Sequence, residues 1–144
     1  MVAHVRLRMR SRRDAWRLLL CIDSECTPIE DTRARLEPVA RELNGTFRSS
    51  TVRAVVVDHS LEGWFLADRE ALAAYLGCPL SRLRWYPSPE TICRPAETMG
   101  QVFHRARRTF DKVGDLARLA QVVDVEAIAA TSGTFREFRE ALLR

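Results

Sequence analysis

The chain has 144 residues, of which 47% are hydrophobic and 29% charged, proportions typical of a soluble globular domain. No apolar run approaches the roughly 18 residues of a membrane span, and the stretch 18–22 is too short for a signal peptide. These features exclude a membrane-spanning chain and predict one cytoplasmic domain over residues 1–144.

The basic residues are unusual, because Lys112 is the only lysine among 23 Lys and Arg, and the net charge is +4. The planar guanidinium group of arginine can bind two phosphate oxygens at once, which would favour phosphate binding. Codon usage in a GC-rich genome explains the same excess of arginine, so both interpretations stay open. The four cysteines show no C-x-x-C spacing and are predicted to be reduced thiols, with Cys21 buried in an apolar run.

Two strand patterns open the chain. Residues 5–10 (VRLRMR) alternate strictly, which favours a strand with one basic face. Residues 16–22 (WRLLLCI) are almost continuously apolar, which predicts a strand buried on both faces, as in a parallel sheet.

A helix is expected next. Thr27 is a candidate N-cap, Pro28 suits the first helical position, and Glu30 completes the capping box. Asn44-Gly45 is the expected stop, and Pro38 should kink the helix or split it in two.

Residues 52–57 (VRAVVV) predict a second buried strand, so the segment forms a β-α-β unit and the fold class is α/β with a small parallel sheet. A short helix should carry Glu62 with Trp64 and Phe65, which we assign to the core. Asp68 is expected to cap a helix over residues 69–76 that ends at Gly77.

The remainder divides into a proline-rich loop over residues 78–95 and a helical portion over residues 95–144. One helix should carry the apolar stripe from Met99 to Phe110, and a Thr134/Glu137 capping box should start the last helix. We therefore expect an α/β core over residues 5–77, followed by helices.

Acidic side chains follow both predicted strands: Asp23 and Glu25 after the first, Asp58 and Glu62 after the second. Ligands bind at the carboxyl ends of strands in open α/β sheets, so these carboxylates should converge there. Carboxylate oxygens bind Mg²⁺, and such clusters support two-metal phosphoryl chemistry. Capping of the next helix is the structural alternative for these acids.

An alternative comes from "DSECT", residues 23–27, which is similar to the D-x-D-x-T signature of haloacid-dehalogenase-like phosphatases. In that hypothesis Asp23 is the nucleophile and Glu25 its acid/base.

Basic residues offer a nucleic-acid surface. Arg105, Arg107 and Arg108 should lie on the polar side of the 99–110 helix, where they can follow a phosphate backbone, although a solvated helix face explains them equally well. His59, beside the acidic edge, is a candidate general base.

The segment "HSLEGWFLADREAL" is the most distinctive of the chain. Together with "LLLCIDSEC" and the C-terminal "FDKVGDLARLAQVVDVEAI" and "FREFREALL", it resembles a bacterial family known as domain of unknown function 4276. The resemblance implies a TOPRIM-like (topoisomerase–primase) fold and Mg²⁺- or Mn²⁺-dependent cleavage of DNA or RNA, in an antiphage system beside a companion ATPase. It implies that Asp23, Glu25 and Glu62 are catalytic metal ligands, and that Lys112 contacts the nucleic acid.

The chain departs from the family pattern at two places. The acidic pair is D-x-E rather than D-x-D, and no Glu precedes Glu25, although family members open with a strand that carries one. We therefore expect the first strand-helix unit to be missing, the metal site to be incomplete, and an exposed sheet edge to favour a homo-oligomer. The second hypothesis is a non-catalytic domain that binds nucleic acid or an ATPase partner.

Overall fold

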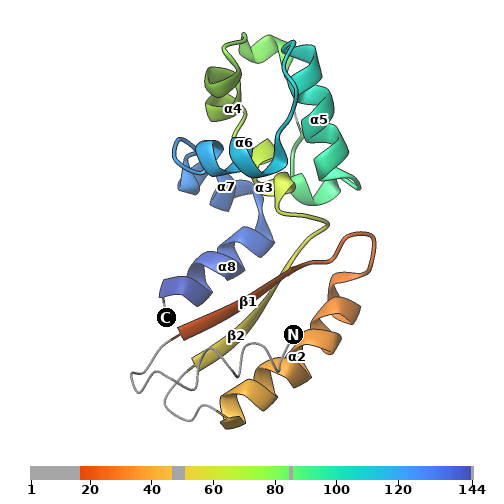
Figure 1. Cartoon of the computed structure of the whole chain (residues 1–144), viewed down its shortest axis with the longest axis vertical. Coiled ribbons are helices and arrows are strands. Elements are labelled where there is room, and N and C mark those ends of the chain that lie inside the picture. The colour runs from red at the N-terminus through yellow and green to blue at the C-terminus, as the bar shows by residue number, and fades with distance from the viewer. Residues whose placement is uncertain (1–16, 47–50, 85, 144) are drawn as a thin grey trace.

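The computed structural model describes residues 17–46, 51–84 and 86–143, so the predicted strand at residues 5–10 lies outside the described part. The fold is α/β, with a two-stranded parallel sheet and helices before and after it (Figure 1). The elements are β1 (Arg17–Asp23), α2 (Ile29–Thr46), β2 (Thr51–Val57), α3 (Glu62–Ala67), α4 (Arg69–Leu76), η1 (Leu80–Arg82), η2 (Pro89–Thr91), α5 (Pro95–Arg105), α6 (Lys112–Leu119), α7 (Val125–Thr131) and α8 (Gly133–Leu143).

The predicted β-α-β unit is confirmed. β1 pairs with β2 in parallel, from Arg17 opposite Thr51 to Asp23 opposite Val57. α2 and α8 lie on either side of the strand pair, while α3 to α7 gather beyond the carboxyl ends of both strands (Figure 1). The acidic residues that follow the strands are therefore carried to the boundary between the sheet and these helices.

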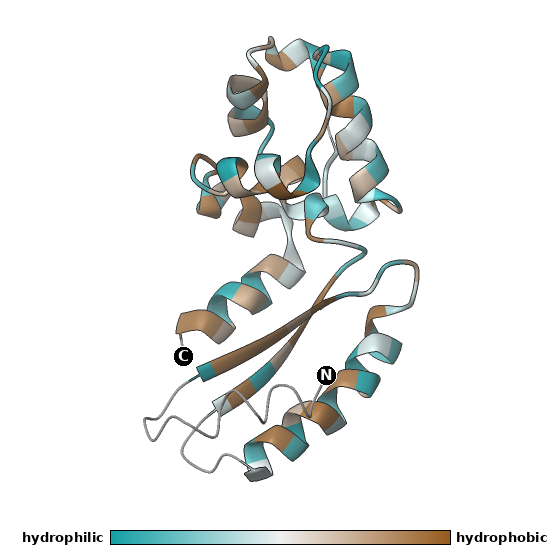
Figure 2. Ribbon diagram, viewed as in Figure 1, coloured by the Kyte–Doolittle hydropathy of each residue, from teal (hydrophilic) through white to brown (hydrophobic). Residues whose placement is uncertain are grey.

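β1 is less buried than its sequence predicts. It is hydrophobic along its length (Figure 2), yet Cys21 is exposed and Ile22 keeps 39% of its surface accessible. The predictions of a strand buried on both faces and of a buried Cys21 are wrong. Leu18 and Leu20 pack against a cluster that α2 and β2 build, but α8 packs mainly against β2, so among the described residues β1 is covered less than β2.

α2 differs from its prediction at both ends. It begins at Ile29, with the Pro28 carbonyl accepting from the backbone N–H of Thr32 at 3.1 Å, one residue later than expected. At the other end the helix continues through Asn44 and Gly45 to Thr46. Tertiary contact explains this extension, because the Asn44 amide bonds both backbone groups of Val52, donating to the carbonyl at 2.9 Å and accepting from the N–H at 2.8 Å.

Pro38 lies inside α2, and the predicted split of the helix is wrong. Proline removes one backbone donor from the helix, a local cost. Buried residues on both sides of Pro38, Leu36 before it and Leu43 after it, anchor the helix, and Leu43 packs with Val52 of β2. This burial holds the helix together across the proline.

α4 follows its prediction closely. Asp68 accepts a hydrogen bond from the Ala71 N–H at 3.0 Å, and the helix ends where Gly77 adopts a left-handed conformation with φ of 65°. The Cys78 N–H then bonds the Ala73 carbonyl at 3.1 Å, as in a Schellman motif. All these signals are local, which is why the sequence reveals them.

α5 ends at Arg105 instead of continuing to Phe110. Arg107 takes the left-handed position that glycine usually occupies, with φ of 59°. The Arg108 N–H bonds the Phe103 carbonyl at 2.9 Å, which completes a second Schellman motif. The prediction of one helix from Met99 to Phe110 is wrong because an arginine supplies the unexpected stop.

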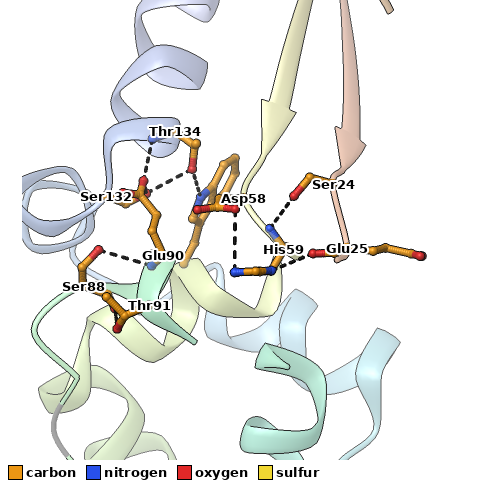
Figure 3. Close-up of polar contacts among 10 residues, drawn as sticks. Ser24, Glu25, Asp58, His59, Ser88, Glu90, Thr91, Ser132 and Thr134 are labelled. Carbon is orange, nitrogen blue, oxygen red and sulfur yellow. Dashed lines mark hydrogen bonds and ion pairs between the residues drawn. The ribbon is translucent and has the colours of Figure 1, made fainter. Parts of the chain in front are cut away.

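α8 starts at Gly133, so the predicted Thr134/Glu137 capping box is wrong. Ser132 Oγ accepts from the Phe135 N–H at 3.1 Å, and the Glu90 carboxylate accepts from the Thr134 N–H at 2.9 Å (Figure 3). Thr134 Oγ1 instead accepts from the Trp64 indole at 3.2 Å. The helix N-terminus is thus capped partly from a distant loop, which a local motif cannot reveal.

Trp64 and Phe65 are buried in the core, as predicted. Phe65 belongs to the cluster that α3, α4, α5 and α6 build, whereas Trp64 packs with Val57 of β2 and with residues of α7 and α8. No helix among the described residues is long and apolar enough to span a membrane.

Candidate functional site

Asp23 is the last residue of β1 and lies at the boundary between the sheet and the helices. Its Oδ1 accepts a hydrogen bond from the Leu61 backbone N–H at 3.2 Å. Leu61 directly precedes α3, so this bond joins the end of β1 to the start of α3 across 38 residues of sequence. The backbone therefore holds the carboxylate in place through Oδ1.

Glu62 is the first residue of α3, and its side chain is fully buried, with 0% of its surface accessible. Neither carboxylate oxygen has a hydrogen bond of good geometry among the described residues. Its close partner is the Lys112 ammonium, with Nζ 2.7 Å from Oε1. A buried carboxylate is costly without such a partner, so this ion pair is central to the site.

The electrostatics connect the predicted ligands to one another. Burial raises the pKa of Asp23, and the negative charge of Glu62 raises it further, against the lowering effects of the Leu61 N–H and of Lys112. Burial also acts to raise the pKa of Glu62, but contacts dominated by Lys112 outweigh it and hold that pKa below its ordinary value. Asp23 and Glu62 are therefore close enough for their charges to interact.

Lys112 completes this arrangement. Its contact with Glu62 raises its pKa, against the lowering effect of burial, and the charges of Glu62, Asp23 and Glu25 add to the increase. All three carboxylates predicted as metal ligands thus act on one ammonium. Of the three, only Glu62 makes a close contact with Lys112, which the sequence placed among the nucleic-acid contacts instead.

Glu25 lies at the rim. Both Glu25 and His59 adopt left-handed conformations, with φ of 54° and 55°, which is uncommon for residues other than glycine. The Glu25 N–H bonds the His59 carbonyl at 2.7 Å, and His59 Nδ1 lies 2.6 Å from the Glu25 carbonyl. The Glu25 side chain points away from this pair (Figure 3), so its backbone has a structural role here and its carboxylate is the most peripheral of the three.

His59 is tied to the same loop. Its backbone N–H donates to Ser24 Oγ at 2.8 Å, and its Nε2 lies 3.9 Å from Asp58 Oδ1 (Figure 3). The Ser24 N–H in turn donates to the Val57 carbonyl at 2.8 Å, which continues the strand pairing beyond the sheet. These contacts support a structural role for His59 and leave its candidacy as a general base without geometric support.

The site opens into a cleft of about 610 Å³ at the carboxyl ends of the strands. Sequence reasoning missed two residues that line it, Thr32 and Arg35 of α2. They lie three positions apart on one helix, the spacing that places side chains on the same face, which is the signal that could have identified them. The residues that line the cleft are Cys21, Ile22, Asp23, Ser24, Glu25, Thr27, Thr32, Arg35, Val57, Leu61 and Lys112.

The predicted arginine surface is only partly present. Arg105 and Arg107 are exposed around the end of α5. Arg108 instead stacks on the Tyr75 ring at 4.8 Å and donates to the Tyr75 carbonyl at 3.0 Å, and it lies 3.5 Å from Asp115. Arg108 therefore has a packing role, and none of these arginines lines the cleft with Lys112.

Among residues 17–46, 51–84 and 86–143, no group of three or more His, Cys, Asp or Glu side chains is arranged to hold a metal ion. The donors that the site offers are two carboxylates, those of Asp23 and Glu62, with Glu25 at the rim. The buried Glu62 carboxylate already faces one cationic group, the Lys112 ammonium at 2.7 Å, and carboxylate oxygens are also the ligands that a divalent cation prefers.

Comparison with known proteins gives one match. The model of a family described as a domain of unknown function (DUF4276) matches residues 3–143, almost the whole chain. No curated protein matches the chain. No solved structure matches it either.

Proposed function

The chain belongs to the DUF4276 family, and we propose that it is a TOPRIM-like domain that cleaves phosphodiester bonds of DNA or RNA with Mg²⁺ or Mn²⁺. One observation carries the proposal: the fully buried carboxylate of Glu62 lies 2.7 Å from the Lys112 ammonium, and its charge acts on Asp23 at the end of β1. Strand ends of α/β sheets are where such ligands bind.

The residues present suit a divalent cation. Asp23 and Glu62 would hold it, and Glu25 is near enough at the rim to add its charge. Such an ion, when bound, neutralises charge on the phosphate and activates water as a nucleophile. The negative charges of Asp23 and Glu62 would favour its binding once Lys112 no longer compensates them, and burial of Glu62 limits screening by water.

The basic residues of the cleft have complementary roles. Lys112 and Arg35 both line it and would neutralise the phosphate oxygens of a bound strand. The Leu61 N–H orients Asp23 by its bond to Oδ1. The cleft thus joins carboxylates with cationic groups, a combination that phosphoryl chemistry needs and that simple helix capping does not.

Cleavage is tested with a supercoiled plasmid and a single-stranded RNA, each incubated with Mg²⁺ or Mn²⁺. We expect metal-dependent nicking by the wild-type protein, and a fall to the metal-free level in both Asp23→Asn and Glu62→Gln. The control is Asp31→Asn, which makes the same change on the exposed first turn of α2, outside the cleft. Nicking by Asp23→Asn at the wild-type rate would contradict the proposal.

A second function, a non-catalytic domain that binds nucleic acid or a companion ATPase, is favoured by a different observation. The ammonium of Lys112 already balances Glu62, and the described residues hold no three-ligand metal group. This function predicts nucleic-acid binding that weakens with salt and persists without metal, and no cleavage in any metal. Three further expectations remain proposals: a role in antiphage defence, which the family resemblance implies, a cytoplasmic location, which the reduced cysteines suggest, and a homo-oligomer, which an exposed sheet edge would favour.

The phosphatase alternative has less geometric support. Its mechanism needs Glu25 beside Asp23 as acid/base, but the Glu25 side chain is exposed, and its charge is the smallest of the causes that shift the pKa of Asp23. Turnover of a phosphomonoester, with an acyl-phosphate trapped on Asp23, would favour this alternative over the nuclease.

A further inference from the structure

Lys112 has a setting that phosphate binding by itself does not explain. It is the first residue of α6, and its Nζ lies 2.7 Å from an oxygen of the fully buried Glu62. A lysine held ready for a phosphate would extend into solvent, whereas this ammonium is turned inward onto a carboxylate. The side chain nevertheless keeps 61% of its surface accessible, so it borders both the protein interior and the open cleft.

The ammonium lies where an added cation would bind. The Glu62 oxygens have no hydrogen bond of good geometry among the described residues, so Lys112 supplies their close charge compensation. A divalent ion on Glu62 would lie within a few ångströms of this ammonium, and like charges at about 4 Å repel by several kcal/mol at the effective dielectric of a protein surface. Glu62 cannot bind both cations well at the same time.

We propose that the Lys112 ammonium is an internal cation of this cleft, that is, a counter-ion supplied by the protein itself. A divalent metal ion must displace this ammonium from Glu62 in order to bind there. The inference rests on the proposed function, because it takes the ligand of the cleft to be a divalent ion. The displaced ammonium then becomes free to bind a phosphate oxygen in the cleft. Metal and phosphate therefore bind cooperatively, since each favours the state in which Lys112 has left Glu62.

Lys112 lines the cleft and the fully buried Glu62 does not, so an ion reaches Glu62 only when the Lys112 side chain moves aside, while contacts within the chain hold the backbone at Lys112. The N-terminus of α6 is held by Asp115, whose Oδ2 accepts from the Asp111 N–H at 2.8 Å and whose own N–H donates to the Asp111 carbonyl at 2.8 Å. Tyr75 donates a further bond to Asp115 Oδ1 at 2.5 Å. Only the flexible, largely exposed side chain of Lys112 has to rotate.

The test uses the fact that Lys112 is the only lysine of the chain. Wild-type protein labelled with ¹³C,¹⁵N-lysine gives one side-chain ammonium resonance, which we follow during a Mg²⁺ titration without nucleic acid. We expect it to move, with saturation, toward the position seen in Glu62→Gln, where the ion pair is absent. Mg²⁺ binding detected by calorimetry with no movement of this resonance would overturn the inference.

Mn²⁺ affinity provides the second measurement. By calorimetry, Lys112→Gln should bind Mn²⁺ at least about tenfold more tightly than wild type, because no ammonium has to be displaced from the buried carboxylate. Lys112→Arg, which keeps the charge, should remain near wild type, and thermal unfolding checks that each variant is folded. Equal or weaker binding by a folded Lys112→Gln would contradict the inference.

The outcomes separate this inference from the proposed function. Tighter Mn²⁺ binding by Lys112→Gln, with no cleavage by any variant, would support the internal cation and contradict the nuclease. Metal-dependent cleavage that Asp23→Asn loses, with Mn²⁺ affinity unchanged in Lys112→Gln, would support the nuclease and contradict the internal cation.

Discussion

At the scale of single residues, Asp23 has a carboxylate whose charge is unfavourable in the folded protein. Its pKa is raised by burial and by the charge of Glu62, so the ionised carboxylate is less favourable in the folded state than in the unfolded chain. This penalty is absent below the ordinary aspartate pKa of about 3.9 and is complete above the raised folded value. At neutral pH, Asp23 therefore lowers the stability of the fold.

The first prediction follows from the unfavourable contribution of the ionised Asp23 to stability. Asp23→Asn should raise the free energy of unfolding at pH 7 by up to about 1 kcal/mol, a modest gain because the carboxylate is partly solvated. Asparagine keeps an oxygen that can accept from the Leu61 N–H. The gain should vanish when denaturant unfolding is repeated near pH 3. Asp31→Asn, in the first turn of α2, should show no gain.

A destabilised Asp23→Asn at neutral pH would show that the carboxylate is a structural partner. That result would argue against a site held ready for a ligand. The free energy of unfolding thus bears on the functional proposal. A carboxylate that neighbouring charges repel is expected at a site where a bound ligand later compensates its charge.

At the scale of elements, α2 demonstrates a helix end that tertiary contact has moved. Asn44-Gly45 is a strong local stop signal, yet both residues lie inside the helix. The two bonds from Asn44 to Val52 cap the edge of β2 and hold the last turn of α2 against the strand. The end of α2 is therefore set by the side-chain hydrogen bonds of Asn44 to β2, and not by the stop signal of Gly45.

Two glycines test this conclusion with the same substitution. Gly45→Ala should stabilise the protein by roughly 0.5–1 kcal/mol, because Gly45 is helical and a Cβ there meets nothing within 4 Å. Gly77→Ala has equal space, but its φ of 65° is left-handed, so it should destabilise by about 1 kcal/mol or more. Chemical denaturation of both variants provides the measurement, and a destabilised Gly45→Ala would mean that α2 ends before Thr46.

At the scale of the whole molecule, Trp64 joins the sheet to the helices. It packs beside Val57 of β2. The centroid of its ring lies 5.0 Å from the ring centroid of Phe135 and 5.2 Å from that of Phe138, both in α8. Its indole N–H reaches Thr134 Oγ1 in the capped N-terminus of α8. Trp64 directly follows Glu62 and Gly63, so the same short helix carries a candidate ligand and this anchor.

Removal of the anchor should therefore affect the entire fold. Trp64→Ala is expected to cost about 3–5 kcal/mol through the cavity left in the core. Trp64→Phe, which keeps an aromatic ring but removes the indole donor to Thr134 Oγ1, should cost less, about 1–3 kcal/mol. Val113→Ala, at a side chain with 80% of its surface exposed, should be nearly neutral. Similar losses for Trp64→Ala and Val113→Ala would contradict the role of Trp64.

The sequence by itself determined the features that depend on neighbours along the chain. These are the β-α-β unit, the α/β class, the family, the Asp68 cap and Gly77 end of α4, and the acids that follow each strand. Capping, left-handed glycine and apolar runs act over a few residues, so their physics is readable in a short window. The candidate carboxylates were found for the same reason.

Tertiary structure decided what those carboxylates face. Lys112 contacts Glu62 across 50 positions of sequence, and Glu90 caps a helix that starts more than forty positions later. The exposure of Cys21 in β1 likewise depends on packing between elements, because α8 packs mainly against β2. Such pairings form when whole helices and strands pack together. The surface buried by this packing outweighs the capping and secondary-structure preferences of a short segment, so no single segment encodes the pairings. That is why the acidic site was predictable and its internal cation was not.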